Sequence, residues 1–464
     1  MRSANQNRHI RNSGLLILMA TLGGMAWGDP PPLNTAAGVN PADFRYTTFA
    51  SGLNFPVGMQ QLSDGSILVG TSNPLPNQTY YNSTGSLLRF TDSNHDGVAD
   101  NAAGTVVYSG LPGVISSVTV AGNLVFVTSS AANPTISVLQ MSSPTSYTLL
   151  GTEQFSFPNQ PDGNDWEHTT YVSISQPTPG SPGSYDLYFN IGSQADNVST
   201  PPTATVGASG VFNATLHGAS IYRLTINESS STPTFSNMTQ IAQGLRNSAG
   251  LAFQPSTGNL YLDDNGIDNG VNDPTYTNTQ KEYSADEMNM IPANQVGTTV
   301  PDFGFAHSVI LESDGSQVGD GLGVQPLQTF RATANGAQTE GPNEIAFAPS
   351  SFPAGLNNGI FVTFSGNGYS GTDNDQNALV YYDPTTNQYF HFIESGQDGL
   401  GHIDGVLSTD DGLFLSDMAT DGSLYDENPT PSGAIYELVA IPEPGFLTGL
   451  IGAAMLLRRR PKRQ

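Results

Sequence analysis

Two histidines and an arginine–asparagine pair stand where the sequence predicts strands to begin. His168, Arg246–Asn247 and His402 each come immediately before or at the start of an apolar run. A histidine beside a guanidinium suits the removal of a proton from a ligand whose developing negative charge is stabilised by the cation. His168 is therefore the candidate general base, and Arg246 the candidate partner for an anionic or polarised group. The open alternative is that His168 and His402 fill the interior with satisfied hydrogen bonds.

An acidic loop at residues 92–100 is a second candidate for chemistry. Oxygen-bearing side chains occupy positions 1, 3, 5 and 9 of this loop: Asp92, Asn94, Asp96 and Asp100. With Gly97 at position 6, this spacing suits a hard cation such as calcium, wrapped by a tight loop. Ala103 replaces the usual glutamate at position 12, so we expect weak binding, and a plain Asx turn is the alternative.

Six copies of one pattern must position these residues. Each copy has a turn, an apolar strand, a glycine-containing hairpin and a second alternating strand, and the copies begin at residues 55, 111, 168, 246, 340 and 402. Such strands predict an all-β domain, and six units in series predict a six-bladed β-propeller. The residues that open the inner strands then meet at one end of an axial channel. A β-helix is the alternative, although its repeats are shorter and more regular.

Further strands are expected around this ring. We expect the run 44–49 to pair beside residues 435–438 and close the ring. The expected outer strands are residues 86–90, 135–140, 220–226, 378–382 and 433–439, with a shorter candidate at 287–291.

The charge of the propeller segment, residues 29–440, excludes some partners. Residues 29–441 contain 39 acidic and six basic residues, a net charge of −33. Such a surface repels phosphate backbones and anionic lipids, so nucleic acid is excluded as the default partner. The chain has no cysteine, which excludes thiol catalysis and cysteine-ligated metals.

The two ends are predicted to be targeting segments. Residues 1–28 combine arginines, a short apolar run and a small-residue cleavage site, which is typical of a secretory signal peptide. Residues 441–464 contain Pro442-Glu443-Pro444, 13 apolar residues and an arginine cluster. Such a run is about 20 Å long as a helix, which is short for a membrane span.

This terminal segment resembles the Pro-Glu-Pro (PEP-CTERM) sorting signal of Gram-negative bacteria. The resemblance implies recognition by an exosortase-type membrane protease as a partner. It also implies export to the periplasm, outer surface or extracellular matrix, with membrane contact only through residues 441–464 before processing.

Several blocks of the chain resemble the glucose/sorbosone dehydrogenase family, six-bladed propellers that use pyrroloquinoline quinone (PQQ) and calcium. The blocks are His168 with its strand, residues 244–253, residues 264–267 and residues 285–291. The resemblance implies that His168 takes a proton from a sugar hydroxyl while Arg246 and Asn247 hold the quinone. It implies that the backbone carbonyls of Gly266 and Ile267 bind calcium, and that His402 lies at the cofactor.

The chain also departs from that family. The family's Arg-x-Arg opener of the last blade reads His402-Ile403-Asp404, its Gly-Gln-Gly-Gly motif reads 111–115 without glutamine, and no lysine lies near 361–371. Lost cations weaken binding of a tricarboxylate cofactor. We therefore expect either a divergent sugar or alcohol dehydrogenase, or a non-catalytic, calcium-stabilised propeller that binds glycans or proteins at the same mouth.

Overall fold

Short antiparallel strands build almost the whole fold, as the alternating sequence pattern predicts. The computed structural model describes residues 29–130, 134–156, 168, 170, 173–194, 203–206, 211–230, 232–267, 284–311, 315–330, 341–366, 378–394, 397 and 399–442. The expected signal peptide, and the sorting segment from residue 443 onward, lie outside these residues. Within the described residues, no helix is long and apolar enough to cross a membrane.

Most of the strands fall into groups of four antiparallel neighbours, which we number as blades in chain order. Blades 1 to 3 are β2 (Pro56–Gln61), β3 (Ile67–Pro74), β4 (Ser83–Phe90) and β5 (Thr105–Pro112); β6 (Val114–Ala121), β7 (Leu124–Ser130), β8 (Thr135–Ser143) and β9 (Ser146–Ser156); and β10 (Ser173–Pro177), β11 (Ser184–Ile191), β14 (Ser220–Asn227) and β15 (Thr234–Gln243). Blades 4 to 6 are β16 (Leu251–Phe253), β17 (Leu260–Asp264), β18 (Asp286–Ile291) and β21 (Gln328–Phe330); β22 (Pro342–Phe347), β23 (Ile360–Phe364), β24 (Leu379–Asp383) and β25 (Gln388–Ile393); and β26 (Ile403–Ser408), β27 (Gly412–Asp417), β28 (Gly433–Ala440) and β1 (Phe44–Leu53). One residue pair, Phe364 with Ile403, joins blades 5 and 6 into a continuous sheet.

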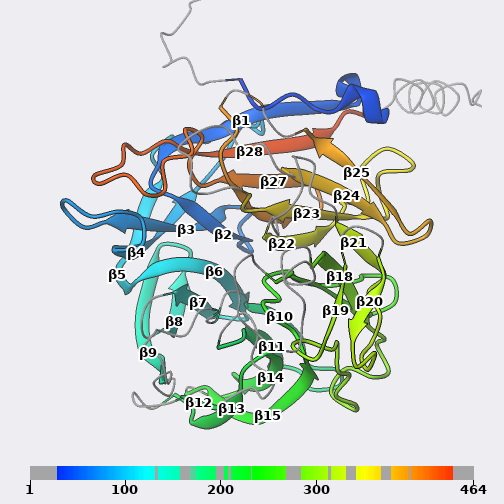
Figure 1. The fold of residues 1–464 in the computed structure, drawn as a ribbon. Helices are drawn as coiled ribbons and strands as arrows, with labels where there is room; N and C mark the ends of the chain where they lie inside the picture. The colour runs from blue at the N-terminus through cyan, green and yellow to red at the C-terminus, as the bar shows by residue number, and fades with distance from the viewer. Residues whose placement is uncertain are drawn as a thin grey trace, which may run out of the picture.

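The first strands of these groups surround a common axis. Strands β2, β6, β10, β16, β22 and β26 all line one central cavity, while β1, β9, β15 and β25 lie at the periphery of Figure 1. This arrangement confirms the expected all-β, propeller-like fold. Because each inner strand begins at one end of the channel, the residues that precede these strands gather around one mouth.

The ring is closed by the two ends of the described chain. Strand β1 lies antiparallel to β28, with Tyr46 opposite Leu438 and Ala50 opposite Ile435, and the two strands lie side by side in Figure 1. The predicted pairing of residues 44–49 with 435–438 is therefore confirmed. The first strand of the chain completes the last sheet, so the ring is held by hydrogen bonds between distant segments.

The expected outer strands are the third strands of their sheets, which is a correction to the sequence analysis. Each is followed by a fourth strand, such as β5 after β4, or β25 after β24. In β5 the residues Thr105, Val106, Ser109, Gly110 and Pro112 are exposed, so this edge strand has no buried face to impose a clear alternation.

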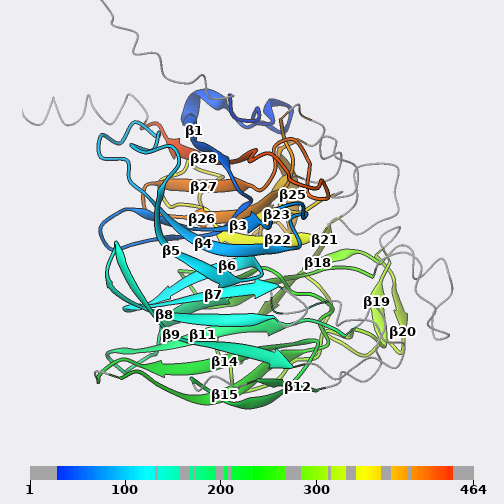
Figure 2. The same cartoon turned by 90° about the vertical axis from the view of Figure 1, so that its left-hand side faces the viewer.

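A few further elements lie outside the four-stranded groups. Strands β12 (Thr203–Val206) and β13 (Ala214–His217) extend blade 2 beyond β9, and β19 (Ser308–Ile310) pairs with β20 (Gln317–Gly319). Figure 2 shows this β19–β20 hairpin standing apart from the blades. Two short 3₁₀ turns, η1 (Thr35–Ala37) and η2 (Pro41–Asp43), lead into β1.

Aromatic rings form the core between the closing blade and blade 1. Phe49 of β1 is 1% exposed, and its ring centroid lies 6.0 Å from Phe90 of blade 1 and 5.2 Å from Phe414 of blade 6. A buried phenylalanine shared by two blades stabilises the closure by removing its ring from water and filling the space between the sheets.

We predict that Phe49→Ala lowers the free energy of unfolding by about 3–5 kcal/mol, because it leaves a cavity at the closure. Urea unfolding followed by circular dichroism measures this loss. Val106→Ala, at a side chain that is 60% exposed on β5, is the control and changes stability by less than about 0.5 kcal/mol. Equal effects of the two substitutions would contradict the assigned closure.

Candidate functional site

The structure brings His168 and Arg246 together through one intervening residue. The backbone N–H of His168 donates to the carbonyl of Ser193 at 3.2 Å, and the N–H of Ser193 donates to the carbonyl of Arg246 at 2.7 Å. His168 is half-buried, whereas Arg246 is 2% exposed. Two residues that lie far apart in the sequence thus flank the same short segment at the mouth of the channel.

Asn265 connects this pair to blade 5. Its backbone N–H donates to the carbonyl of Asn247 at 3.3 Å. When its side-chain amide is oriented with the nitrogen toward these oxygens, Asn265 Nδ2 donates to the carbonyls of Asn247 at 3.1 Å and Pro342 at 3.0 Å. The residues at the start of blades 4 and 5 are therefore fixed relative to each other by a single asparagine.

A second polar cluster joins blades 5 and 6. Asn343 Nδ2 donates to Asp404 Oδ1 at 2.5 Å, and the Ser365 hydroxyl donates to the same oxygen. His402 Nδ1 donates to the carbonyl oxygen of Ser365. Both His402 and Asp404 are 1% exposed. We call the whole set the mouth: His168, Ser193, Arg246, Asn247, Asn265, Asn343, Ser365, His402 and Asp404.

Four buried polar atoms of the mouth have no hydrogen-bond partner among the described residues. They are the hydroxyl oxygen Ser193 Oγ and three acceptors, Asn247 Oδ1, His402 Nε2 and Asp404 Oδ2. Because His402 donates through Nδ1, its Nε2 is an acceptor in the neutral ring. An amide oxygen, an imidazole nitrogen and a carboxyl oxygen form a set of acceptors that suits a ligand rich in hydroxyl donors.

Carboxylates at the ends of second strands bind the backbone of the residues that precede the inner strands. Asp264, the last residue of β17, accepts the backbone N–H groups of Arg246 at 3.0 Å and Asn247 at 2.7 Å. Asp417, the last residue of β27, accepts those of Gly401 and His402, both at 2.9 Å. The same device thus fixes the backbone at the start of blades 4 and 6.

Burial makes the carboxyls beside Arg246 weak acids. Removal from water raises the pKa of Asp264 to about 7, against the opposing hydrogen bonds from the Asn247 and Arg246 N–H groups and the charge of Arg246. Burial likewise raises the pKa of Glu287 to about 8, helped by the charge of Asp264. Burial also raises the pKa of Asp263 well above its usual range. These groups hold protons near neutral pH that exposed carboxyls release.

Glu344 is a further carboxyl with a raised pKa, and it borders the channel. It is half-buried on β22, and its Oε2 accepts the backbone N–H of Val406 at 3.0 Å. Burial raises the pKa of Glu344 to about 8; the Val406 hydrogen bond opposes the shift, and the charge of Asp404 adds to it. Burial also raises the pKa of Asp404 itself.

Gly266 and Ile267 lie beside Arg246 at a small cavity that also borders Glu287. The N–H of Gly266 donates to Asp286 Oδ1 and that of Ile267 to the Ser284 hydroxyl, both at 2.8 Å. These bonds fix the loop, and no described group of three or more His, Asp or Glu side chains is arranged to hold a metal ion. Calcium binding by the Gly266 and Ile267 carbonyls stays a prediction.

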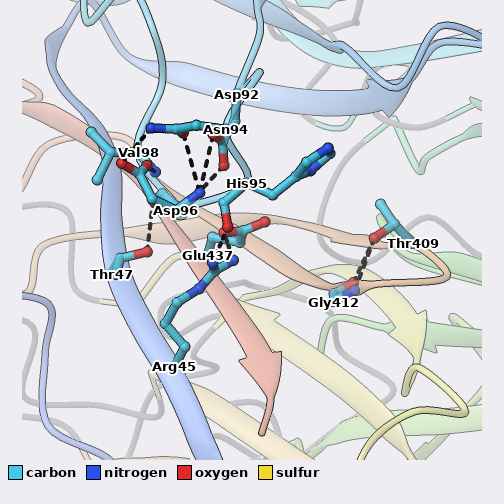
Figure 3. A network of polar contacts seen from close by, with 11 residues as sticks. Arg45, Thr47, Asp92, Asn94, His95, Asp96, Val98, Thr409, Gly412 and Glu437 are labelled. Atoms are coloured by element: carbon cyan, nitrogen blue, oxygen red, sulfur yellow. Dashed lines mark hydrogen bonds and ion pairs between the residues drawn. The ribbon is translucent and has the colours of Figure 1, made fainter.

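The acidic loop 92–100 adopts tight Asx-type turns, as Figure 3 shows. Asp92 Oδ2 accepts the N–H of Gly97 at 2.8 Å, and Asp96 Oδ1 accepts the N–H of Val98 at 3.0 Å. Asn94 donates to Asp96 Oδ2 at 2.9 Å, and Asp100 accepts from Ser93. The loop is therefore ordered by its own hydrogen bonds, the geometry of the Asx-turn alternative, and its calcium binding remains untested.

Arg45 anchors this loop to the closing sheet. Its guanidinium donates to the His95 carbonyl and forms an ion pair with Glu437 at 2.9 Å (Figure 3). The loop lies at the outer part of blade 6, on β1 and β28, and not among the residues of the mouth. The two sites that the sequence suggested are thus separate.

The described residues of the mouth do not fit a tricarboxylate cofactor such as PQQ. Arg246 is the only Lys or Arg among them, and the carboxyl of Asp264 interacts with its charge. Position 404 carries a buried carboxyl where the family resemblance implies a cation. Three of the four unpartnered atoms are acceptors, and a carboxylate offers them no donor. We derive no chemical step through a quinone.

Four residues that shape this site were not predicted from the sequence. Glu344 follows Asn343 at the start of repeat five, and Asp404 was considered only as a departure from a motif. Asp264 and Asp417 each follow an apolar run at the end of a second strand, 260–262 and 413–415. The sequence therefore shows an aspartate after the second apolar run of two repeats, and this recurrence could have indicated both residues.

No protein-family model matches the chain, and no curated protein matches it. Its fold is similar to solved structures. A Trichoderma reesei protein of carbohydrate-active enzyme family AA12 has a TM-score of 0.55 at 14% identity, over 89% of this chain and 99% of that one. A putative oxidoreductase (glucose dehydrogenase) from Thermus thermophilus has a TM-score of 0.51 at 16% identity, over 85% of this chain and 100% of that one.

A third neighbour is the PQQ domain of pyranose dehydrogenase from Coprinopsis cinerea, in its holo form. It has a TM-score of 0.50 at 13% identity, over 88% of this chain and 98% of that one. At such identities the likeness establishes the fold. The chain is therefore a β-propeller whose fold is similar to the folds of these solved structures.

We predict that the protein loses stability as the pH rises from 5 to 8. Because the folded-state pKa of Glu344 is raised to about 8, the native state binds more protons than the unfolded chain across this interval. The free energy of unfolding then falls by up to about 1.4 kcal/mol per pH unit for each such group. Urea unfolding at pH 5, 6, 7 and 8 measures the slope.

Glu344→Gln removes the titration of this group while keeping its shape, so its slope is shallower than that of the wild type. Asp383→Asn is the matched control, since hydrogen bonds from Thr385 and Thr386 leave the pKa of Asp383 lowered despite the opposing effect of desolvation. Its slope between pH 5 and 8 equals that of the wild type. An unaltered slope in Glu344→Gln would show that this carboxyl ionises normally.

Proposed function

We propose that this protein is an exported β-propeller that binds a neutral sugar or similar polyhydroxylated ligand at its mouth. The observation that carries the proposal is the set of three unpartnered buried acceptors, Asn247 Oδ1, His402 Nε2 and Asp404 Oδ2. Leaving a buried polar atom unpaired costs about 1–3 kcal/mol. Hydroxyl groups of a sugar donate hydrogen bonds to such atoms, and binding recovers that cost.

Charge further favours a neutral ligand over an anion. The segment 29–441 carries a net charge of −33. Within the described mouth, the charge of Arg246 is opposed by Asp264. The net negative charge of residues 29–441 repels an anion at long range, and the mouth offers an anion few hydrogen-bond donors. A neutral polyol meets neither obstacle.

The test is calorimetric titration of the purified protein with D-glucose and D-glucuronate, which share a ring and differ in charge. We expect glucose to bind and glucuronate to bind at least about tenfold more weakly. His402→Gln is expected to raise the Kd for glucose about tenfold, because the amide places its acceptor differently from Nε2. His391→Gln, on the outer strand β25, is the control and leaves the Kd unchanged.

Equal affinity for the two ligands, or an unchanged Kd in His402→Gln, would contradict sugar binding at the mouth. If glucose does not bind, the protein is titrated with galactose and with xylose at the same concentrations. Failure of all three neutral sugars rejects the proposal.

The second candidate is an active PQQ-dependent sugar dehydrogenase. The observation that favours it is the link of His168 to Arg246 through Ser193, which unites the base and the guanidinium that the family resemblance requires. The solved neighbours include a protein named as a glucose dehydrogenase and a PQQ domain of pyranose dehydrogenase. Dye reduction with glucose, PQQ and calcium that disappears in His168→Ala would favour this candidate over simple binding.

We also propose that the chain is exported and sorted through its two ends. The support is the signal-peptide pattern of residues 1–28 and the Pro-Glu-Pro, apolar and arginine segments of residues 441–464. Expression in a Gram-negative host that contains an exosortase is expected to yield a mature chain that begins near Asp29 and lacks the C-terminal segment. Intact-mass measurement of the secreted protein tests this.

Replacement of Glu443 by Gln is expected to leave the C-terminal segment attached while removal of the signal peptide proceeds. A chain of full mass in the cytoplasm would contradict export. Tail removal that is unaffected by Glu443→Gln would contradict the sorting mechanism.

A further inference from the structure

The channel contains a cavity in addition to the mouth. It encloses about 320 Å³ and is bordered by all of the inner strands β2, β6, β10, β16, β22 and β26. Its lining includes Met59, Gln60, Phe253, Glu344 and Leu407. Pockets that hold small molecules in proteins have volumes of about 300–1,000 Å³, mostly apolar walls and a few convergent polar groups. The cavity meets these criteria.

The cavity lies toward the opposite end of the channel from the mouth. On β26 the lining begins at Val406, four residues after His402, a distance of about 13 Å along a strand. On β2 the lining residues are Met59 and Gln60, and the hairpin turn at residues 62–66 follows after Gln61. A ligand in this half of the channel therefore leaves His402 free to contact a second molecule at the mouth.

Glu344 is the chemically distinctive group of this cavity. It is the only titratable side chain among the residues of the lining, all of which the structure describes. On β22 it is the lining residue nearest the mouth. Glu344 interacts electrostatically with Asp404 of β26, and Asp404 interacts in turn with His402. The lining from β2, β6, β10 and β16 contributes amide, hydroxyl and apolar side chains, and no charge.

We propose that the far half of the channel is a second binding site, for a small uncharged molecule with an apolar body and one carbonyl or hydroxyl oxygen. The carboxyl of Glu344 donates a hydrogen bond to that oxygen, while Met59, Phe253 and Leu407 contact the apolar body. The site is independent of the proposed sugar binding at the mouth.

The charge of the lining selects against ions. Because burial raises the pKa of Glu344 to about 8, this carboxyl is mostly protonated at pH 6 to 7 and gives a cation no counter-charge. The lining has no Lys, Arg or His to neutralise an anion. An uncharged oxygen acceptor matches the protonated carboxyl, and the match is lost when Glu344 ionises.

Three probes of one shape test the proposal: cyclohexanone, cyclohexylammonium and cyclohexanecarboxylate. Saturation-transfer NMR and calorimetry on the full protein at pH 6 are expected to show binding of the ketone, at least about tenfold tighter than either ion. At pH 9 the affinity for the ketone falls by up to about tenfold, because about one tenth of the Glu344 carboxyl stays protonated. Glu344→Gln retains ketone binding at pH 6, since the amide still donates, and loses the pH dependence.

Ser408→Phe tests the location, because a phenyl ring at this half-buried lining position fills the cavity. It is expected to abolish ketone binding and to leave glucose binding at the mouth unchanged, whereas Ser408→Ala alters neither. Tighter binding of the ammonium ion, an unaltered ketone affinity in Ser408→Phe, or no ketone binding at millimolar concentrations would overturn the proposal. Loss of glucose binding alone bears on the mouth and not on this site.

Discussion

Buried carboxylates at the ends of second strands hold the start of the inner strands, and the mouth depends on this interaction. Asp264 binds the backbone N–H groups of Arg246 and Asn247, and Asp417 binds those of Gly401 and His402. Each of these two carboxyl groups accepts two adjacent backbone N–H groups at once. Each carboxylate therefore fixes where the following side chains enter the channel, and the propeller scaffold brings segments of blades 3 to 6 together in one cluster.

Buried carboxyl groups also set the chemistry of the site. Their burial raises the pKa of Asp264 to about 7 and that of Glu344 to about 8, so much of the acid inside the ring is neutral when the exterior is strongly anionic. A neutral interior that is rich in acceptors favours hydroxylated ligands over carboxylated ones. A fold and the charge of the site that it carries are separable properties, so the propeller fold does not by itself determine what the mouth binds.

The repeat pattern predicted the fold because alternation and turns report directly on half-buried strands. It predicted the closure by residues 44–49 for the same reason. The fourth strands escaped prediction, since an edge strand such as β5 is exposed on much of its length and has no face to encode. At the site, His168, Arg246 and His402 were predicted as candidates from their place before inner strands. Glu344 and Asp404 were not, because burial alone gives them their properties, and burial depends on contacts between blades.

The account depends most on the mouth being a neutral, hydroxyl-binding cluster at one end of the channel. A crystal structure of the protein soaked with D-glucose at pH 7 tests this directly. The account predicts a sugar ring within hydrogen-bond distance of His402 Nε2 and Asp404 Oδ2, with Arg246 and His168 at the same end of the channel. A sugar bound only on the outer surface, or His402 Nε2 paired with a protein donor in the sugar-free crystal, would contradict it.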